Sequence, residues 1–163
     1  MIKGLHHNAY RCRDSEETRR FFEDFLGLRL AGALEIKETK TGRRTEVLHT
    51  FYEMGDGSYL AFFEAPDRPF EFKDQHDYDL HIALEVDRAT LDRMYRKGKA
   101  EGREVRGVSD HGFIDSIYFR DPNGYVIELT CKREGHDEAM DPAKNGARSI
   151  VERWTKSKQT KAA

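Results

Sequence analysis

The chain has 163 residues, of which 37% are hydrophobic and 36% are charged, a length that suits one compact domain or two small modules sharing a core. Its 28 basic and 30 acidic residues give a formal net charge of -2, and this near balance argues against a general nucleic-acid-binding role. There is no apolar run of membrane-spanning length, no signal-peptide core and only two cysteines, so we expect a cytoplasmic protein with no membrane partner.

The first part of the chain follows the order strand, helix, three strands. A strand is expected over residues 4–13. Asp14 or Ser15 is a suitable N-cap for the helix that follows, whose apolar residues are spaced i, i+1, i+4, i+5. The turn Met54-Gly55-Asp56-Gly57 would join the last two strands of this part. The three strands after the helix are expected around residues 28–37, 44–54 and 58–65.

The same order recurs after a charged connector. The turn Asp121-Pro122-Asn123-Gly124 suits a tight reversal, because proline fixes φ and Asn-Gly tolerates a positive φ. The chain therefore reads as two βαβββ modules, residues 4–65 and 79–132, within a single domain of residues 1–134. In the second module we expect strands around 80–86, 103–108, 114–120 and 124–131, and a helix over roughly 88–101.

Residues 135–163 form a polar tail with one short helical pattern. That pattern covers residues 147–154, where Ile150, Val151 and Trp154 lie on one side of the expected helix. The helix is a candidate contact between two copies of the chain.

Two ionisable side chains of the second module are expected to point into one cavity. Neighbouring side chains alternate between the two faces of a strand. In the last strand the apolar alternate residues mark the helix-facing side, which leaves Glu128 on the opposite side. In the strand over 80–86 the same rule places His81 on the cavity side. Two such groups in one cavity are costly without a partner, and a metal ion would satisfy both.

A third ligand is expected from the adjacent His6 and His7, which must point to opposite sides of the first strand. Alternation alone does not decide between them, but Ala9 follows His7 by two positions as Ala83 follows His81, which favours His7. Two histidines and one carboxylate leave coordination positions open, as in non-haem Fe(II) oxygenases. Each residue taken alone is more readily interpreted as an ordinary strand residue. The matched positions of all three in a repeated module favour the metal.

The chain resembles the vicinal oxygen chelate superfamily over roughly residues 4–132, in the stretches LHHNAYRCRDSEETRRFFEDFLGL, DLHIALEV and SIYFRDPNGYVIEL. That group includes glyoxalase I, fosfomycin- and bleomycin-resistance proteins and type I extradiol dioxygenases. The resemblance implies an α+β fold in which paired βαβββ modules form a half-open mixed β-barrel around a divalent metal. It also implies homodimers that bind small molecules. In the family the ligand histidine precedes an aspartate by seven positions, which supports His7 before Asp14.

The resemblance also indicates a branch of the family. Glyoxalase I uses a fourth protein ligand on the last strand of the first module, where this chain has Ala61, so the three-ligand dioxygenases and fosfomycin-modifying enzymes are favoured. Tyr118 stands where extradiol enzymes carry a tyrosine that hydrogen-bonds the substrate, and His111 lies in the loop where they place a further histidine. Their acid–base histidine is replaced here by Ser58, for which His49 is a candidate substitute.

The leading hypothesis is an extradiol-type dioxygenase that uses Fe(II), held by His7, His81 and Glu128, to act on an aromatic or catecholic small molecule. The expected catalytic residues are Tyr118, His111 and His49, and the expected pocket walls are Phe51, Tyr59 and Phe63. One alternative is a lyase, isomerase or small-molecule transferase that uses Mn, Ni, Co or Zn at the same site. The other is a small-molecule binding or resistance protein, although such relatives lack the metal ligands that this chain keeps.

Overall fold

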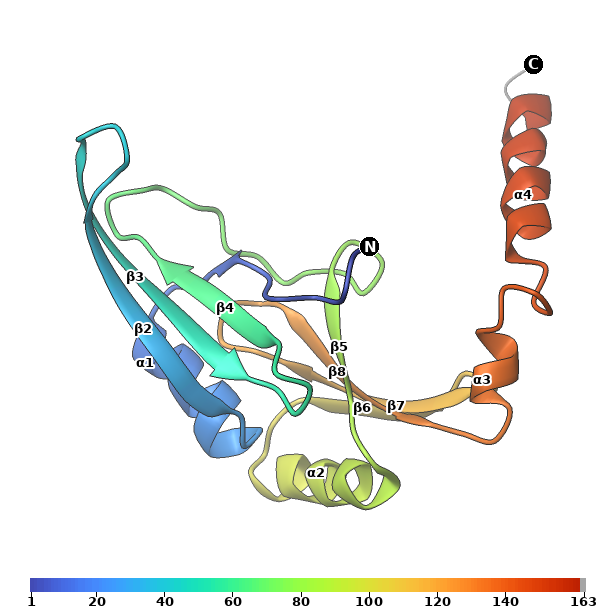
Figure 1. Ribbon diagram of the computed structural model, residues 1–163. Helices are drawn as coiled ribbons and strands as arrows, with labels where there is room; N and C mark the ends of the chain where they lie inside the picture. Colours follow the sequence, from blue (N-terminus) through green and yellow to red (C-terminus); the bar gives the residue numbers. More distant parts are fainter. Residues whose placement is uncertain (162–163) are drawn as a thin grey trace.

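The computed structural model describes the backbone of residues 1–161 and the side chains of residues 1–158. The described chain contains two four-stranded mixed sheets, each with helical segments against one face, followed by two helices at the C-terminal end (Figure 1). The expected α+β class and the repeated βαβββ order are confirmed. Among the described residues, no helix combines the length and the apolar character that crossing a membrane requires.

The first module forms a sheet of order β1-β4-β3-β2, in which β1 runs parallel to β4 and the other neighbours are antiparallel. The helix starts where predicted, because the Asp14 side chain accepts a hydrogen bond from the backbone N–H of Glu17 at 2.8 Å. It continues as a π-helical segment that buries three phenylalanines against the sheet. The elements are β1 (Tyr10–Arg11), α1 (Ser15–Arg19), η1 (Arg20–Phe25), β2 (Arg29–Glu38), β3 (Arg44–Glu53) and β4 (Tyr59–Glu64).

The first strand is shorter than the predicted residues 4–13. Of the predicted residues, only Tyr10 and Arg11 form a continuous ladder with β4, although His7 makes a single bridge to Tyr59 in the same register. Between them the side-chain oxygen of Asn8 accepts a hydrogen bond from the backbone N–H of Ala61 at 3.0 Å. A side-chain amide therefore takes the place of a backbone partner, which an alternation pattern does not reveal.

The second module repeats this arrangement with the order β5-β8-β7-β6, and β5 runs parallel to β8. The predicted helix-facing residues of β8 are buried, Ile127 among them, whereas on the edge strand β5 Ile82 is buried and Leu84 is half-buried. Its helix is capped by Asp87, whose side chain accepts a hydrogen bond from the backbone N–H of Thr90 at 2.7 Å. The elements are β5 (His81–Glu85), α2 (Arg88–Ala100), β6 (Val105–Asp110), β7 (Ile114–Arg120) and β8 (Val126–Lys132).

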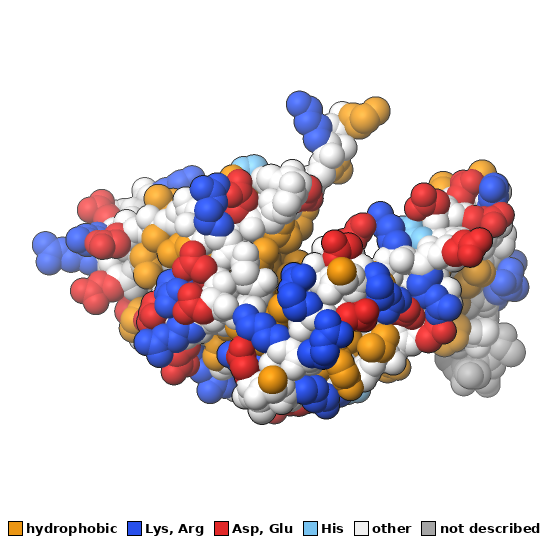
Figure 2. All heavy atoms as spheres, turned by 90° about the horizontal axis from the view of Figure 1, so that it is seen from below, with side chains coloured by type: hydrophobic (Ala, Val, Ile, Leu, Met, Phe, Trp, Pro, Cys, Tyr) orange, Lys and Arg blue, Asp and Glu red, His pale blue; other side chains and the backbone are white. Residues whose placement is uncertain are grey.

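The two modules share one core on the helical side of their sheets. The Phe25 ring meets the Phe119 ring edge to face, with centroids 5.2 Å apart. The Asn123 side chain accepts a hydrogen bond from the backbone N–H of Arg13 at 2.8 Å. Seen from the side of α2, acidic and basic side chains are interspersed over the surface, in keeping with the small net charge (Figure 2).

The tail contains α3 (His136–Ala139) and α4 (Ala147–Lys161). Helix α4 is longer than the predicted residues 147–154, and it stands apart from both sheets (Figure 1). Residues 162 and 163 of the expected tail lie outside the described residues.

Candidate functional site

His81 and Glu128 lie together on neighbouring strands. Parallel pairing of β5 with β8 sets Ala83 opposite Glu128, and His81 Nε2 lies 3.3 Å from Glu128 Oε2. The other ring nitrogen of His81, Nδ1, lies 2.7 Å from the carbonyl oxygen of Asp77. A carbonyl oxygen only accepts, so Nδ1 carries a proton. A neutral ring would then turn the lone pair of Nε2 toward a carboxylate oxygen, an arrangement that calls for a cation, either a proton or a metal ion.

The Glu128 carboxylate is buried, with 5% of the residue exposed. Its Oε1 accepts a hydrogen bond from the Ser116 hydroxyl at 2.5 Å. The Ser116 side chain is itself fully buried and lies 3.2 Å from the Thr130 hydroxyl. A buried carboxylate is stable only with partners. Hydrogen bonds of this kind orient metal-ligating carboxylates and histidines in metalloproteins, so the residues present fit a divalent cation between His81 and Glu128.

Tyr118 and His111 extend this group. The Tyr118 hydroxyl lies 3.4 Å from Glu128 Oε1 and 2.8 Å from His111 Nε2. Burial, together with the nearby charge of Glu128, raises the pKa of Tyr118 above its ordinary value, so the phenol stays protonated at neutral pH. The structure thus places four predicted site residues side by side, three of them on the second sheet and His111 in the loop between β6 and β7. We call His81, His111, Tyr118 and Glu128 the second-module group.

The other five predicted residues gather on the first sheet, and we call His7, His49, Phe51, Tyr59 and Phe63 the first-module group. The His7 ring lies 5.6 Å from the Phe51 ring and 6.2 Å from the His49 ring, centroid to centroid. Phe51 also meets the Tyr59 ring at 6.2 Å. These side chains form an aromatic wall with one exposed histidine in it.

His49 is held more tightly than a free acid–base histidine. Its ring stacks on the Phe63 ring at 3.6 Å with an interplanar angle of 12°. Its Nδ1 lies 3.0 Å from the carbonyl oxygen of Phe62, so this nitrogen donates a proton there. Only Nε2 remains for proton exchange, in a residue that is 7% exposed.

The described part of the chain does not bring His7 together with His81 and Glu128 as one set of ligands. Among the described residues, no three histidine, cysteine, aspartate or glutamate side chains come together as a metal-binding group. His81 and Glu128 form a pair, whereas His7 lies with the first-module group. Ala61, buried opposite Phe51 on β4, offers no ligand atom. Within one chain the described residues therefore bring together two of the three predicted ligands, His81 and Glu128.

Three residues that contact the second-module group were not identified from the sequence. Ser116 binds Glu128, and Asp77 binds His81 through its carbonyl. The Arg106 guanidinium lies 5.1 Å from the centroid of the Tyr118 ring and forms an ion pair with Asp77 at 2.8 Å. Ser116 could have been found, because it precedes Tyr118 by two positions on the same face of β7. Asp77 contributes through its backbone and leaves no such signal.

Comparison with known proteins gives consistent matches. A model of the "Glyoxalase/Bleomycin resistance protein/Dioxygenase superfamily" matches residues 4–129. Lactoylglutathione lyase of Neisseria meningitidis is 32% identical over 140 residues, which cover 82% of this chain and 94% of that protein. An iron-dependent extradiol dioxygenase of Rhodococcus jostii is 27% identical over 158 residues, which cover 91% of this chain but 50% of the dioxygenase. This chain thus spans about half the length of that relative.

Similarity extends to solved structures. The crystal structure of the fosfomycin resistance protein FosX from Mesorhizobium loti aligns with a TM-score of 0.62 and 25% sequence identity. The alignment covers 85% of this chain and 99% of that one.

Proposed function

This chain belongs to the glyoxalase/bleomycin resistance protein/dioxygenase superfamily, and we propose that it is a divalent-metal-dependent enzyme that cleaves an aromatic diol with dioxygen. The observation that carries the proposal is the pair formed by His81 and Glu128, in which an imidazole nitrogen and a carboxylate oxygen face each other at 3.3 Å. The aromatic wall of the first-module group supplies the matching substrate surface.

His81, Glu128 and a His7 from a second copy would hold the metal, for which Fe(II) is the proposed ion. At these residues Fe(II) would supply Lewis acidity toward the substrate hydroxyl groups and the electron-transfer chemistry that reaction with dioxygen requires. We propose a second copy because the described residues of one chain do not place His7 with His81 and Glu128. Both potential histidine ligands are exposed, His81 with 42% of its side chain.

The remaining site residues would bind and orient the substrate. Tyr118, whose raised pKa keeps its proton in place, would donate a hydrogen bond to a substrate oxygen next to Glu128. His111, 2.8 Å from that hydroxyl, would exchange protons with it. Phe51 and Tyr59 would stack against the aromatic ring and exclude water.

A lyase is the second candidate function, because the lactoylglutathione lyase of N. meningitidis is 32% identical and matches over nearly its whole length. Ala61 argues against that reaction, since glyoxalase I carries a fourth ligand at the corresponding position and alanine has no ligand atom. The placement of Tyr118 and His111 beside Glu128 is the feature that favours the dioxygenase.

The reaction can be decided by a paired assay on protein purified anaerobically without chelator. We expect near-stoichiometric iron, lost in Glu128→Ala, and oxygen uptake with catechols. Conversion of the hemithioacetal of methylglyoxal and glutathione without oxygen uptake, with nickel or zinc bound, would replace the dioxygenase by the lyase. Iron that remains fully bound in Glu128→Ala would contradict the ligand assignment itself.

The sharing of the site between copies has its own test. Chains carrying His7→Ala and chains carrying Glu128→Ala are each expected to be inactive. When they are co-expressed, a mixed pair contains one intact set of ligands if the site is shared, so activity should return to about a quarter of the wild-type level. If each site lies within one chain, no mixed pair has an intact site and activity stays absent.

A further inference from the structure

Helix α4 carries an apolar face that remains exposed. Ile150, Val151 and Trp154 lie at i, i+1 and i+4 on one side of the helix, and they are 52%, 64% and 67% exposed. A helix of this length is marginal in water without packing. Figure 1 shows α4 projecting away from both sheets. The face therefore has the composition of a contact surface, and the described part of the chain leaves it uncovered.

The same helix is basic. Over residues 147–158 it has four basic side chains and one acidic side chain, a net charge of +3. Arg148 and Arg153 are exposed, and within the described residues neither has an ion-pair partner. A partner for α4 should therefore combine apolar surface with unpaired negative charge.

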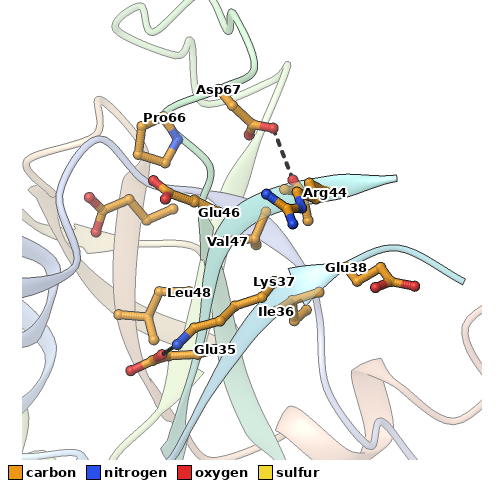
Figure 3. A pocket seen from close by; sticks show the side chains of 12 residues that line it. Glu35, Ile36, Lys37, Glu38, Arg44, Glu46, Val47, Leu48, Pro66 and Asp67 are labelled. Carbon is orange, nitrogen blue, oxygen red and sulfur yellow. Dashed lines mark hydrogen bonds and ion pairs between the residues drawn. The ribbon is translucent and has the colours of Figure 1, made fainter. Parts of the chain in front are cut away.

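The chain has a hollow of that composition, of about 880 Å³, along the β2–β3 hairpin and the residues after β4 (Figure 3). Its apolar side chains are Ile36, Val47, Leu48 and Pro66. Five acidic and two basic side chains line it as well, a net charge of -3. We call it the acidic hollow. Glu38 and Glu46 at this site have no ion-pair partner among the described side chains.

The acidic hollow and α4 lie at opposite ends of the molecule, so a helix cannot reach the hollow of its own chain (Figure 1). Their charges are equal and opposite, and each combines this charge with apolar side chains. We infer that α4 of one copy docks in the acidic hollow of a second copy, with its Trp154 against the apolar side chains there. Reciprocal docking closes a symmetric pair. The inference rests on the pairing of two copies proposed above.

Trp154 is the single tryptophan of the sequence, so its fluorescence reports on this face alone. The full chain, loaded with metal, is followed over a dilution series by emission and acrylamide quenching, with sedimentation in parallel. If α4 is docked, we expect the Trp154 emission to be blue-shifted and shielded from acrylamide in the paired state. Both effects should disappear as the pair dissociates. A tryptophan that stays fully exposed in the paired state overturns the inference.

Charge reversal identifies the surface. The double variants Glu38→Lys/Glu46→Lys and Arg148→Glu/Arg153→Glu should each weaken pairing by about tenfold and expose Trp154, and combining all four changes should restore both. Arg96→Glu, an exposed reversal on α2, is the matched control and should change neither. If the Trp154 emission stays blue-shifted in the Glu38→Lys/Glu46→Lys variant, α4 docks at a surface other than the acidic hollow. A blue shift only with vesicles of anionic lipid makes a membrane surface the occupant. Either result overturns the inference.

The outcome can be separated from that of the proposed function. If the co-expressed His7→Ala and Glu128→Ala chains recover activity while Trp154 stays exposed, the shared site stands and the docking of α4 fails. If Trp154 is shielded in a pair that recovers no activity, the docking stands and the shared site fails.

Discussion

The His81 imidazole faces the Glu128 carboxylate at 3.3 Å while its other nitrogen is fixed by the carbonyl oxygen of Asp77. The Asp77 carbonyl therefore fixes the orientation of the His81 ring, and the hydroxyl of Ser116 fixes that of the Glu128 carboxylate. Two potential ligands whose far sides are fixed present their free atoms toward a common point. In the proposed function, these two ligands would therefore be oriented before any cation or second copy binds.

Removing the hydroxyl behind Glu128 should weaken the site without removing a ligand. Ser116→Ala leaves Oε1 of a buried carboxylate without its 2.5 Å hydrogen bond. We expect metal affinity to fall by about 10- to 100-fold, measured by titration of the metal-free protein. Ser157→Ala on α4 is the matched control and should titrate like the wild type. Unchanged affinity in Ser116→Ala would mean that Glu128 is oriented by other groups.

Tyr118 should act through its hydroxyl alone. Tyr118→Phe keeps the ring under Arg106 but removes the group that lies between Glu128 and His111. We expect kcat to fall by about 100-fold while metal content and the urea midpoint stay unchanged. Because the pKa of Tyr118 is raised, its ionisation should not contribute to the activity profile near neutral pH. Tyr78→Phe, at an exposed tyrosine, should retain full activity, and equal loss in both variants would contradict the assignment.

The order and boundaries of most elements could be predicted from hydrophobic period and turn residues, because both modules use ordinary caps and turns. The first strand was an exception, since Asn8 replaces a backbone partner with its side chain. The segment after Arg19 was another, because apolar residues at i, i+1 and i+4 lie on one side of a short π-helical segment as well as of an α-helix. A sequence pattern indicates on which side of a strand or helix a residue lies, but it does not give the exact path of the backbone.

The arrangement of the candidate residues could be predicted in part for the same reason. Alternation assigned Glu128 and His81 to one side of their sheet, and the structure brings the two together. Alternation says nothing of whether one sheet faces the other, so it could not show that His7 and the second-module group are separate in one chain. That relationship depends on how the modules pack, through Phe25 and Phe119 among others.

The two further histidines should separate into a catalytic and a structural residue. His111 is exposed and reaches the Tyr118 hydroxyl, so His111→Gln should lower kcat and alter its pH profile without affecting stability. His49 is stacked on Phe63 and donates to a carbonyl, so His49→Ala should lower the free energy of unfolding by about 2 kcal/mol. Urea unfolding and steady-state kinetics on both variants check this. The reverse pattern, with activity dependent on His49 alone, would make His49 the acid–base residue.

Asp121 should make stability depend on pH. It is buried in the turn after β7, and burial raises the pKa of its carboxyl to about 6 although backbone N–H groups of Asn123 and Tyr125 donate to it. An acid whose folded-state pKa lies above its unfolded value binds more protons when folded. Its contribution to stability is therefore fully present below about pH 4 and is lost as the pH rises through about 6.

Asp121→Asn tests this directly, because an amide cannot titrate. The variant should be less stable than the wild type at low pH, since its amide nitrogen would meet the Nδ2 group of Asn123, which now donates to Asp121 at 2.9 Å. The difference between the two proteins should then narrow from pH 4 to pH 7, as the wild type loses the stability that its protonated carboxyl gave. Urea unfolding at a series of pH values measures the difference, and Asp79→Asn, at an exposed aspartate, supplies the control. A constant difference across that range would mean that Asp121 titrates alike in the folded and unfolded states.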